Sequence, residues 1–440
     1  MFTLLILADD LTGALDTGVQ FAKKGIPTQV FLSPEGKAEN SAAGSTAVLV
    51  INTDTRHSSL AEAGKIITVC LDRYRDIPYI YKKTDSTLRG NIGAELEALV
   101  MARNIQRLPF VPAYPGLGRT TAGGHQLLKG IPIDKTDMAV DALNPIRHSF
   151  IPDIIGEESD IPVRLIPAKG SPPAPNPESK RREILVYDCE NAGELRDIAH
   201  ALKEQGSLSV TAGCAGFAEF LMEELPFPAR AAPGGLMAAQ AGSGKENIPR
   251  FPVLILSGSR HPVSLSQVKA ALESGFPGIT VDGEKLLREE WFTGEEAAAL
   301  EDNCAKTLKQ HGVCILGTAM AMGQITERAN AAVQSQDKWA EQKNQNGRAT
   351  GTAGVAGLLG KFLKNILKRT GPLHLVIFGG DTLLGIMEIL KFDYIIPIEE
   401  IRPGIVLARA EGKGGSSFIV TKSGAFGDPG MIETIRSYFS

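Results

Sequence analysis

The feature that most constrains the fold is a unit that recurs along the chain: a short apolar run, a turn rich in Gly, Ser or Asp, then apolar residues at helical spacing. In the first half it appears as "TLLIL" before "ADDLTG", "AVLVI" before "NTDTR" and "IPYIY" before "KKTDSTLRG"; in the second half, as "PVLIL" before "SGSRHP" and "HLVIF" before "GGDTLLG". Strands followed by helices predict largely parallel sheets flanked by helices, so we expect an α/β fold. Ligands of such folds bind at the carboxyl ends of the strands, where these polar turns lie.

The length of 440 residues favours two domains over one. The stretch Pro226 to Pro252 is rich in Ala, Gly and Pro, has no periodicity, and separates two series of strand–helix units. We therefore place a first domain at 1–228, a linker at 229–250 and a second domain at 251–440. A proline-rich stretch at 167–183 and a polar stretch at 334–351 are interpreted as surface excursions.

Composition excludes several classes of protein. The net charge of −4 gives no electrostatic support to a nucleic-acid partner. No window approaches the roughly 18 consecutive apolar residues of a membrane span, and "MFTLLILADDLTG" is not typical of a signal peptide. Five cysteines without a C-x-x-C pattern favour a reduced, cytoplasmic protein, and seven scattered histidines do not predict a metal site. A homodimer is compatible with the sequence, but nothing in it specifies one.

Carboxylates and an arginine follow the first two predicted strands. Asp9 and Asp10 lie just before a helix, where one carboxylate would serve as an N-cap; two exceed what capping requires. Such a carboxylate can orient a substrate hydroxyl or take its proton. Arg56 offers a fork of donors suited to a carboxylate or phosphate, although an Asx-turn with a surface arginine explains it equally well.

The segment after "IPYIY" is denser in charged and hydroxyl groups than a solvated turn requires. Its alternative interpretation is a capped turn with surface basic residues, whereas an anionic, hydroxyl-bearing small molecule would use all of its groups. The glycine-rich segment "VPAYPGLGRTTAGGHQ" adds a further arginine. The candidates for substrate binding in the first half are Arg56, Lys82, Lys83, Ser86, Arg89 and Arg119, with Asp85 beside Asp9 and Asp10 as a candidate catalytic carboxylate.

Three glycine and hydroxyl turns follow predicted strands in the second half. Each alone is compatible with an ordinary turn, but three together favour backbone amides arranged around the phosphates of a nucleotide. The segment "GSGK" is not counted, because it lacks the first glycine, the final Ser or Thr and the preceding strand of a P-loop. The candidates for nucleotide binding are Ser257, Gly258, Ser259, Gly379, Gly380, Asp381, Thr382 and Gly424.

With these residues in place, the chain resembles the four-carbon acid sugar kinase family. The resemblance covers nearly the whole chain and rests on "LADDLTGALD", "KKTDSTLRGNIGAEL", "PAYPGLGRTT", "TAGCAGFAEFL", "SGSRHPVSLSQ", "FGGDT" and "TKSGAFGD". It implies an N-terminal domain that binds a sugar acid, a C-terminal domain that binds ATP, and an active site in the cleft between them. It also implies phosphorylation of the terminal (C4) hydroxyl of an acid such as D-threonate, D-erythronate or 3-oxo-tetronate. The chain departs from the family's pattern at "FGGD", where many relatives carry Thr before the glycines.

The expected mechanism is phosphoryl transfer from ATP, with Mg²⁺ on the nucleotide phosphates and closure of the domains around both ligands. Asp9 or Asp10 is expected to orient or deprotonate the hydroxyl, and Asp85 stays open as a third choice. Two alternatives are an NAD(P)-dependent sugar-acid oxidoreductase and a non-catalytic two-lobed sugar-acid sensor. The first lacks an intact G-x-G-x-x-G after its first strand, and the glycine turns argue against the second.

Overall fold

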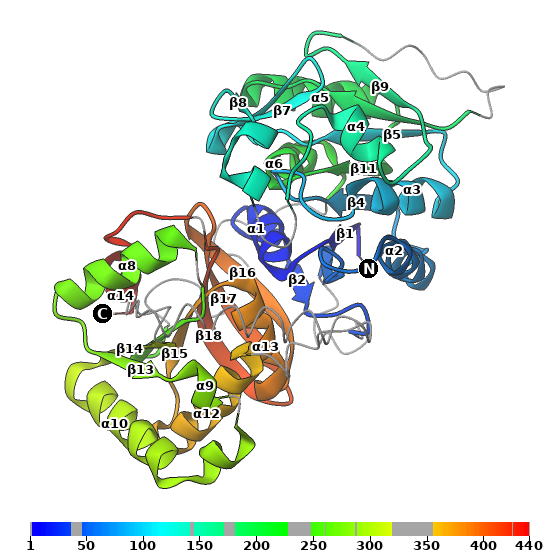
Figure 1. Cartoon of the computed structure of the whole chain (residues 1–440). Helices are drawn as coiled ribbons and strands as arrows, with labels where there is room; N and C mark the ends of the chain where they lie inside the picture. The colour runs from blue at the N-terminus through cyan, green and yellow to red at the C-terminus, as the bar shows by residue number, and fades with distance from the viewer. Residues whose placement is uncertain are drawn as a thin grey trace. The chain divides into compact units, whose positions relative to one another are not determined.

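The computed structural model describes residues 2–36, 46–140, 145–170, 181–227, 248–259, 261–286, 288–318, 355–424 and 426–439. Contacts between Cα atoms divide the chain into two compact units, Met1–Pro233 and Gly234–Ser440. Most of the expected linker, the "GSGK" segment, the polar stretch at 334–351 and most of the proline-rich stretch lie outside the described residues. Each unit is built on its own strands and helices (Figure 1).

The first unit contains eight parallel strands in the order β2-β3-β1-β4-β11-β5-β10-β9. The central strand β1 has the sequence LLILA and is buried over its whole length, which explains why a continuous apolar run predicts it. The strands are β1 (Leu4–Ala8), β2 (Thr28–Phe31), β3 (Val48–Asn52), β4 (Tyr79–Lys83), β5 (Arg107–Val111), β9 (Val163–Ile166), β10 (Glu183–Tyr187) and β11 (Val210–Gly213).

Helices cover both faces of this sheet. Crossovers from β1 to β2 and from β10 to β11 run in one direction, and those from β3 to β4 and from β4 to β5 run in the other. Because such crossovers are right-handed, the two directions put their helices on opposite faces. Accordingly, α6 contacts α1 and α5, whereas α3 contacts α2 and α4. The helices are α1 (Leu11–Ala22), α2 (Leu60–Arg73), α3 (Ile92–Ala102), α4 (Ile151–Gly156), α5 (Ala192–Glu204) and α6 (Ala215–Glu224).

A small antiparallel sheet follows β5 and was not expected from the sequence. It consists of β6 (Arg119–Ala122), β7 (His125–Leu128) and β8 (Ile131–Pro132), joined by short glycine-containing turns. The side-chain amide of Gln126 in β7 donates to the carbonyl oxygen of Ser86 at 2.9 Å, so this sheet is tied to the segment after β4.

The second unit has the strand order β13-β14-β12-β15-β18-β17-β16. The strands from β13 to β18 in this order pair in parallel, and β17 pairs antiparallel with both β18 and β16. Helix α12 contacts both α10 and α13, and α8 contacts α14 over an apolar core that includes Val253, Val268 and Ile432. The elements are β12 (Val253–Ser257), α8 (Pro262–Glu273), β13 (Gly278–Val281), α9 (Gly283–Leu286), α10 (Glu295–His311), β14 (Val313–Thr318), α12 (Val355–Thr370), β15 (His374–Phe378), α13 (Gly380–Leu390), β16 (Phe392–Arg402), β17 (Ile405–Gly412), β18 (Gly415–Lys422) and α14 (Met431–Ser437).

The α/β fold with largely parallel sheets is confirmed. The long ribbon of β16 and β17 (orange in Figure 1) was missed, because Pro397 within β16 is typical of a break in a strand. The pairing of β16 with β17 accommodates it with a register shift between Pro397 and Glu399. Among the described helices, none has both the length and the apolar character needed to cross a membrane.

Candidate functional site

Three carboxylates in the first unit meet on one arginine. Arg56 follows β3 and its Nε lies 2.8 Å from Asp9 Oδ2, while its Nη1 lies 2.9 Å from Asp10 Oδ2. Its Nη2 lies 3.6 Å from Asp85 Oδ1. These residues follow β3, β1 and β4, which are neighbours in the sheet, so the carboxyl ends of three adjacent strands bring the charges together. The sequence placed the three segments apart, and the parallel topology joins them.

Asp10 is the most accessible of the three carboxylates. It is the N-cap of α1, and its Oδ1 accepts a hydrogen bond from the amide of Gly13 at 2.9 Å. The side chain of Asp10 is 25% exposed, against 2% for Asp9 and 11% for Asp85. The N-cap and the charged contact therefore coexist in one residue, because each carboxylate oxygen serves one of them.

Asp9 lies beneath this surface and remains ionised. Burial raises its pKa, but the charges of Arg56, Lys83 and Lys82 outweigh burial and hold the pKa below its ordinary value. Its Oδ1 accepts no hydrogen bond from the described residues and lies 3.8 Å from Lys83 Nζ. A Cβ at Gly13 would lie only 2.4 Å from that same Nζ, so a glycine in the first turn of α1 gives Lys83 its space.

Asp85 organises the turn after β4. Its Oδ2 accepts from the hydroxyl and the amide of Thr87 and lies 2.9 Å from Arg89 Nε, while Arg89 Nη2 donates to Oδ1 at 3.2 Å. Burial raises the pKa of Asp85, but Arg89 and Arg56 hold it well below its ordinary value. The turn is thus held by its own charged and hydroxyl side chains and is largely buried.

Lys82 occupies a different place from the other predicted substrate residues. Both Lys82 and Lys83 lie within β4 rather than after it, and the side chain of Lys82 points into the core, where it is fully buried. Its Nζ lies 2.9 Å from Glu95 Oε2 and donates to the carbonyl oxygen of Lys83 at 2.9 Å. Glu95 on α3 is also buried and accepts from the hydroxyl of Thr55. This pair forms a second, inner layer of charge below Asp9.

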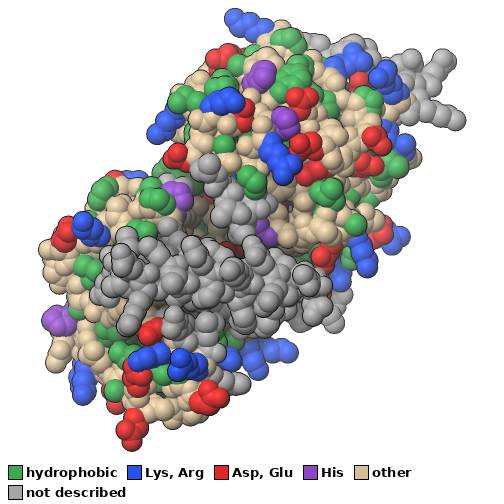
Figure 2. All heavy atoms as spheres, viewed as in Figure 1, with side chains coloured by type: hydrophobic (Ala, Val, Ile, Leu, Met, Phe, Trp, Pro, Cys, Tyr) green, Lys and Arg blue, Asp and Glu red, His purple; other side chains and the backbone are tan. Residues whose placement is uncertain are grey.

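The two remaining candidates of the first unit border the cluster. Ser86 is partly exposed and its carbonyl oxygen is held by Gln126. Arg119 begins β6, and its Nη1 donates to the carbonyl oxygen of Leu117 at 3.0 Å. Burial lowers the pKa of Arg119, and the charge of Asp85 partly offsets this effect, which shows that the arginine lies within the field of the cluster. Elsewhere on the visible face of this unit, acidic and basic side chains are interspersed (Figure 2).

In the second unit, the three glycine turns converge. A Cβ at Gly258 would lie 2.2 Å from Thr382 Oγ1, and one at Gly379 would lie 3.6 Å from Ser259 Cβ. A Cβ at Gly424 would lie 3.1 Å from Ser259 Oγ. The turns after β12, β15 and β18 therefore touch one another at the carboxyl ends of neighbouring parallel strands.

The first turn of α13 presents backbone amides beside these turns. Gly379 precedes the helix with φ of 104°, a conformation that favours glycine, and provides no side-chain cap. Gly380 and Asp381 begin the helix, with Asp381 exposed, whereas Thr382 is buried against Gly258 and Ser257 is fully buried. Uncapped amides at a helix N-terminus suit a phosphate group.

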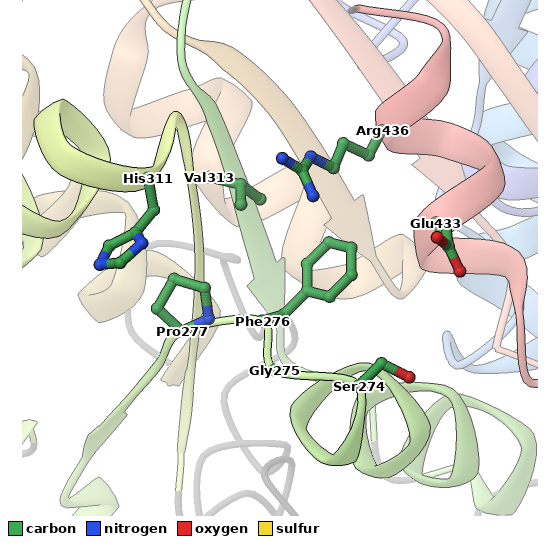
Figure 3. A pocket seen from close by; sticks show the side chains of 8 residues that line it. All are labelled: Ser274, Gly275, Phe276, Pro277, His311, Val313, Glu433 and Arg436. Carbon is green, nitrogen blue, oxygen red and sulfur yellow. The ribbon is translucent and has the colours of Figure 1, made fainter.

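The pocket in Figure 3 lies at the opposite end of the strands of the same sheet. Its lining includes Phe276 and Pro277, which precede β13, and Val313, which begins β14, together with Arg436 of α14. It is therefore at the amino ends of the parallel strands, away from the glycine turns, and we assign no ligand to it. Within the described parts of the chain, no group of three His, Cys, Asp or Glu side chains could hold a metal ion.

Comparison with known proteins matches both units to described families. Residues 4–221 match the sugar-binding N-terminal domain model, and residues 254–432 match the nucleotide-binding C-terminal domain model. The chain is 30% identical to a D-threonate kinase of Salmonella typhimurium over 98% of its own length and 96% of the relative. The chain belongs to the four-carbon acid sugar kinase family.

Other members of this family are similar along their whole length. A D-erythronate kinase of Heliobacterium modesticaldum is 29% identical, covering 100% of this chain and 97% of the relative. A 3-oxo-tetronate kinase of Methylobacterium radiotolerans is 25% identical over 96% and 95%. A crystal structure from Salmonella typhimurium, described as a putative tRNA synthase, superposes with a TM-score of 0.73 at 20% identity over all of both chains. At that identity the superposition supports the fold alone.

Sequence reasoning about this family member missed Glu95, Ser264 and the position of Lys422. Glu95 could have been found, because Ile92, Leu96 and Leu99 form an apolar stripe in which Glu95 is the one charged position. The other two contact one another: Lys422 Nζ donates to Ser264 Oγ at 2.9 Å. They lie 158 residues apart in the chain, so no local pattern in the sequence predicts their contact.

Proposed function

We propose that this chain is an ATP-dependent kinase that phosphorylates the terminal (C4) hydroxyl of a four-carbon sugar acid. We assign the acid to the first unit, at the cluster around Arg56, and the nucleotide to the glycine turns of the second unit. The observation that carries the proposal is the charge cluster, because it combines cations for a carboxylate with carboxylates for hydroxyl groups. The relatives named above are kinases, which favours this activity over an oxidoreductase or a sensor.

The charges of the cluster suit a substrate with a single negative charge. Four carboxylates, Asp9, Asp10, Asp85 and Glu95, lie within ion-pair distance of the four cations Arg56, Lys82, Lys83 and Arg89. Arg119 adds a positive charge within the field of Asp85 and Arg89. A sugar acid brings one carboxylate, which would balance this set, and its hydroxyls can donate to the aspartates.

Among the carboxylates, we propose Asp10 as the group that orients or deprotonates the terminal hydroxyl. Its side chain is the most exposed of the four, and Arg56 holds it in place. Asp9 and Asp85 would keep Arg56, Lys83 and Arg89 oriented toward the acid. Lys82 is proposed to act through the core rather than by touching the substrate, since its ammonium group is enclosed by Glu95 and backbone carbonyls.

In the second unit, the turns that contain Ser257, Gly258, Ser259, Gly379 to Thr382 and Gly424 are proposed to bind the phosphates of ATP. Transfer requires the terminal phosphate to meet the acid's hydroxyl, and its rate depends mainly on positioning and charge stabilisation. We propose that Mg²⁺ arrives bound to the phosphates, where it neutralises their charge. Cytoplasmic location and a homodimer stay predictions from the sequence.

The test is a coupled ADP-release assay with the full chain, ATP and Mg²⁺. The acids are the D and L forms of threonate and erythronate and the 3-oxo-tetronates. One strong substrate is the expected result, and it identifies the acid. ATP binding without turnover on any acid would contradict the assignment of the substrate class. No ATP binding would contradict the assignment of the second unit.

Gly258→Ala is expected to weaken ATP binding at least about tenfold. A Cβ at this position would lie 2.2 Å from Thr382 Oγ1, and the buried, β-branched Thr382 has little freedom to move, so two of the turns must separate. The measurement is calorimetric titration with a non-hydrolysable ATP analogue. Gly64→Ala in α2 is the control, because its Cβ would meet only ordinary contacts at 3.7 Å or more. Unchanged affinity in Gly258→Ala would place the nucleotide elsewhere.

A further inference from the structure

We propose that Lys422 is a positioning residue, which in its protonated form holds the three glycine turns of the second unit in the arrangement that binds the nucleotide. The inference deepens the proposed function and rests on the assignment of ATP to these turns. It concerns Lys422 at the end of β18, a residue that is 2% exposed.

Lys422 contacts all three turns or the elements that carry them. Its Nζ donates to Ser264 Oγ at 2.9 Å and to the carbonyl oxygen of Gly424 at 3.0 Å. The hydroxyl of Ser264, in the first turn of α8, itself donates to the carbonyl oxygen of Gly424 at 3.0 Å. The side chain thus closes a triangle that fixes the turn after β18 against the start of α8.

The backbone of the same residue supports the third turn. The amide of Gly379, which precedes α13, donates to the carbonyl oxygen of Lys422 at 3.0 Å. Gly379 in turn lies against Ser259, and Ser259 lies against Gly424. The starts of α8 and α13 are the two helix N-termini at the proposed phosphate site. Displacing Lys422 would therefore disturb both of them.

The environment of the ammonium group makes this lysine costly to keep charged. The groups that face Nζ from α8, β15 and the turn are the hydroxyl of Ser264, the ring of Phe378 with its centroid at 4.9 Å, and the carbonyl of Gly424. None of these is ionisable. His261 is a titratable residue beside this turn: a Cβ at Gly424 would lie 3.0 Å from His261 Cβ, and His261 Nδ1 accepts from the amide of Val263. Burial lowers the pKa of Lys422 to about 7.

The sign of the pH dependence follows from this position. Folding disfavours protonation of Lys422, so the lysine destabilises the fold most below pH 7, and the cost disappears as pH rises toward its ordinary pKa. Nucleotide phosphates beside the turn supply the missing negative charge and favour the protonated form. Nucleotide binding should therefore take up a proton above pH 7, and affinity should fall as pH rises.

The experiment titrates the full-length protein with a non-hydrolysable ATP analogue and Mg²⁺ between pH 7 and pH 9. The last ionisation of an ordinary phosphate monoester lies near pH 6, and Lys422→Met reveals any proton uptake that belongs to the analogue itself. Calorimetry in two buffers of different ionisation enthalpy measures the proton uptake. The variants are Lys422→Met, Lys422→Arg and Ser264→Ala, with Lys413→Met as the control, because Lys413 is an exposed lysine of the same unit. Thermal unfolding is followed for each variant.

For the wild type we expect affinity to fall several-fold from pH 7 to pH 9, with proton uptake. Lys422→Met should bind about tenfold more weakly at pH 7, the scale of a lost charge-assisted hydrogen bond, without pH dependence or proton uptake. Its melting temperature should equal or exceed that of the wild type, because a buried base is removed. Lys422→Arg should lose the pH dependence because arginine stays charged, and Ser264→Ala should keep it with weaker binding.

Three results would overturn the inference. Wild-type affinity and proton uptake in Lys422→Met would show that the lysine does not position the turns. A role in stability alone would be shown by two results together. The melting temperature of Lys422→Met would fall in parallel with its loss of binding, and Lys422→Arg would retain the pH dependence of binding. Failure of the wild type to bind the analogue at any pH would overturn the proposed nucleotide site, and the inference with it.

Discussion

Asp10→Asn is expected to lower kcat at least ~100-fold with the best acid of the panel while the melting temperature stays close to that of the wild type. The lower bound is the usual contribution of a positioned general base. The fold should tolerate the change, because Asn is as good an N-cap as Asp and keeps an oxygen for the amide of Gly13. The measurement is steady-state ADP release together with thermal unfolding.

Two companion variants separate the possible roles of the carboxylate. Ser59→Ala removes the side-chain cap of α2, which accepts a hydrogen bond from the amide of Glu62 and, among the described residues, from none of the charge cluster. It should lower the free energy of unfolding by about 1 kcal/mol and leave kcat unchanged. Asp9→Asn should lose stability as well as activity, because the buried Arg56 and Lys83 then lose a charged partner. A loss below about tenfold in folded Asp10→Asn would exclude Asp10 as the base and return the role to Asp9 or Asp85.

Lys82→Met is expected to lower the free energy of unfolding of the first unit by about 3–5 kcal/mol, the cost of breaking a buried ion pair from one side. Glu95 would remain fully buried without its cation. For a unit of this size the loss corresponds to a fall of roughly 10 °C in melting temperature. Denaturant unfolding followed by circular dichroism measures it.

The double variant Lys82→Met with Glu95→Leu is the matched comparison. Removing both charges leaves no uncompensated group, so most of the lost stability should return. If the single and double variants were equally destabilised, the loss would come from packing rather than from charge. Any activity that stays lost in the restored double variant would then measure how far this inner layer orients Lys83 and Asp9.

Periodicity predicted the parallel strands, and the polar turns that follow them are where we propose both sites. The sequence did not predict that Lys82 faces the core, because a strand that ends in two lysines gives no sign of which one is buried until a partner such as Glu95 is found. The antiparallel ribbon escaped prediction because Pro397 interrupts its pattern. Contacts such as Lys422 with Ser264 depend on tertiary packing over long separations, which no local pattern encodes.

The strand order of the first unit also determines when the proposed acid site can first form during synthesis. Strand β4, which carries Lys83, lies between β1 and β11, and Lys83 pairs with Ala8 on one side and with Gly213 on the other. Strand β4 therefore lies between the strands of the first unit that come first and last along the chain. Non-local pairings of this kind form late and slowly. A nascent chain must be synthesised almost to the end of the first unit before β4 has both its neighbours, so binding of the acid at the proposed site would report that β11 has joined the sheet.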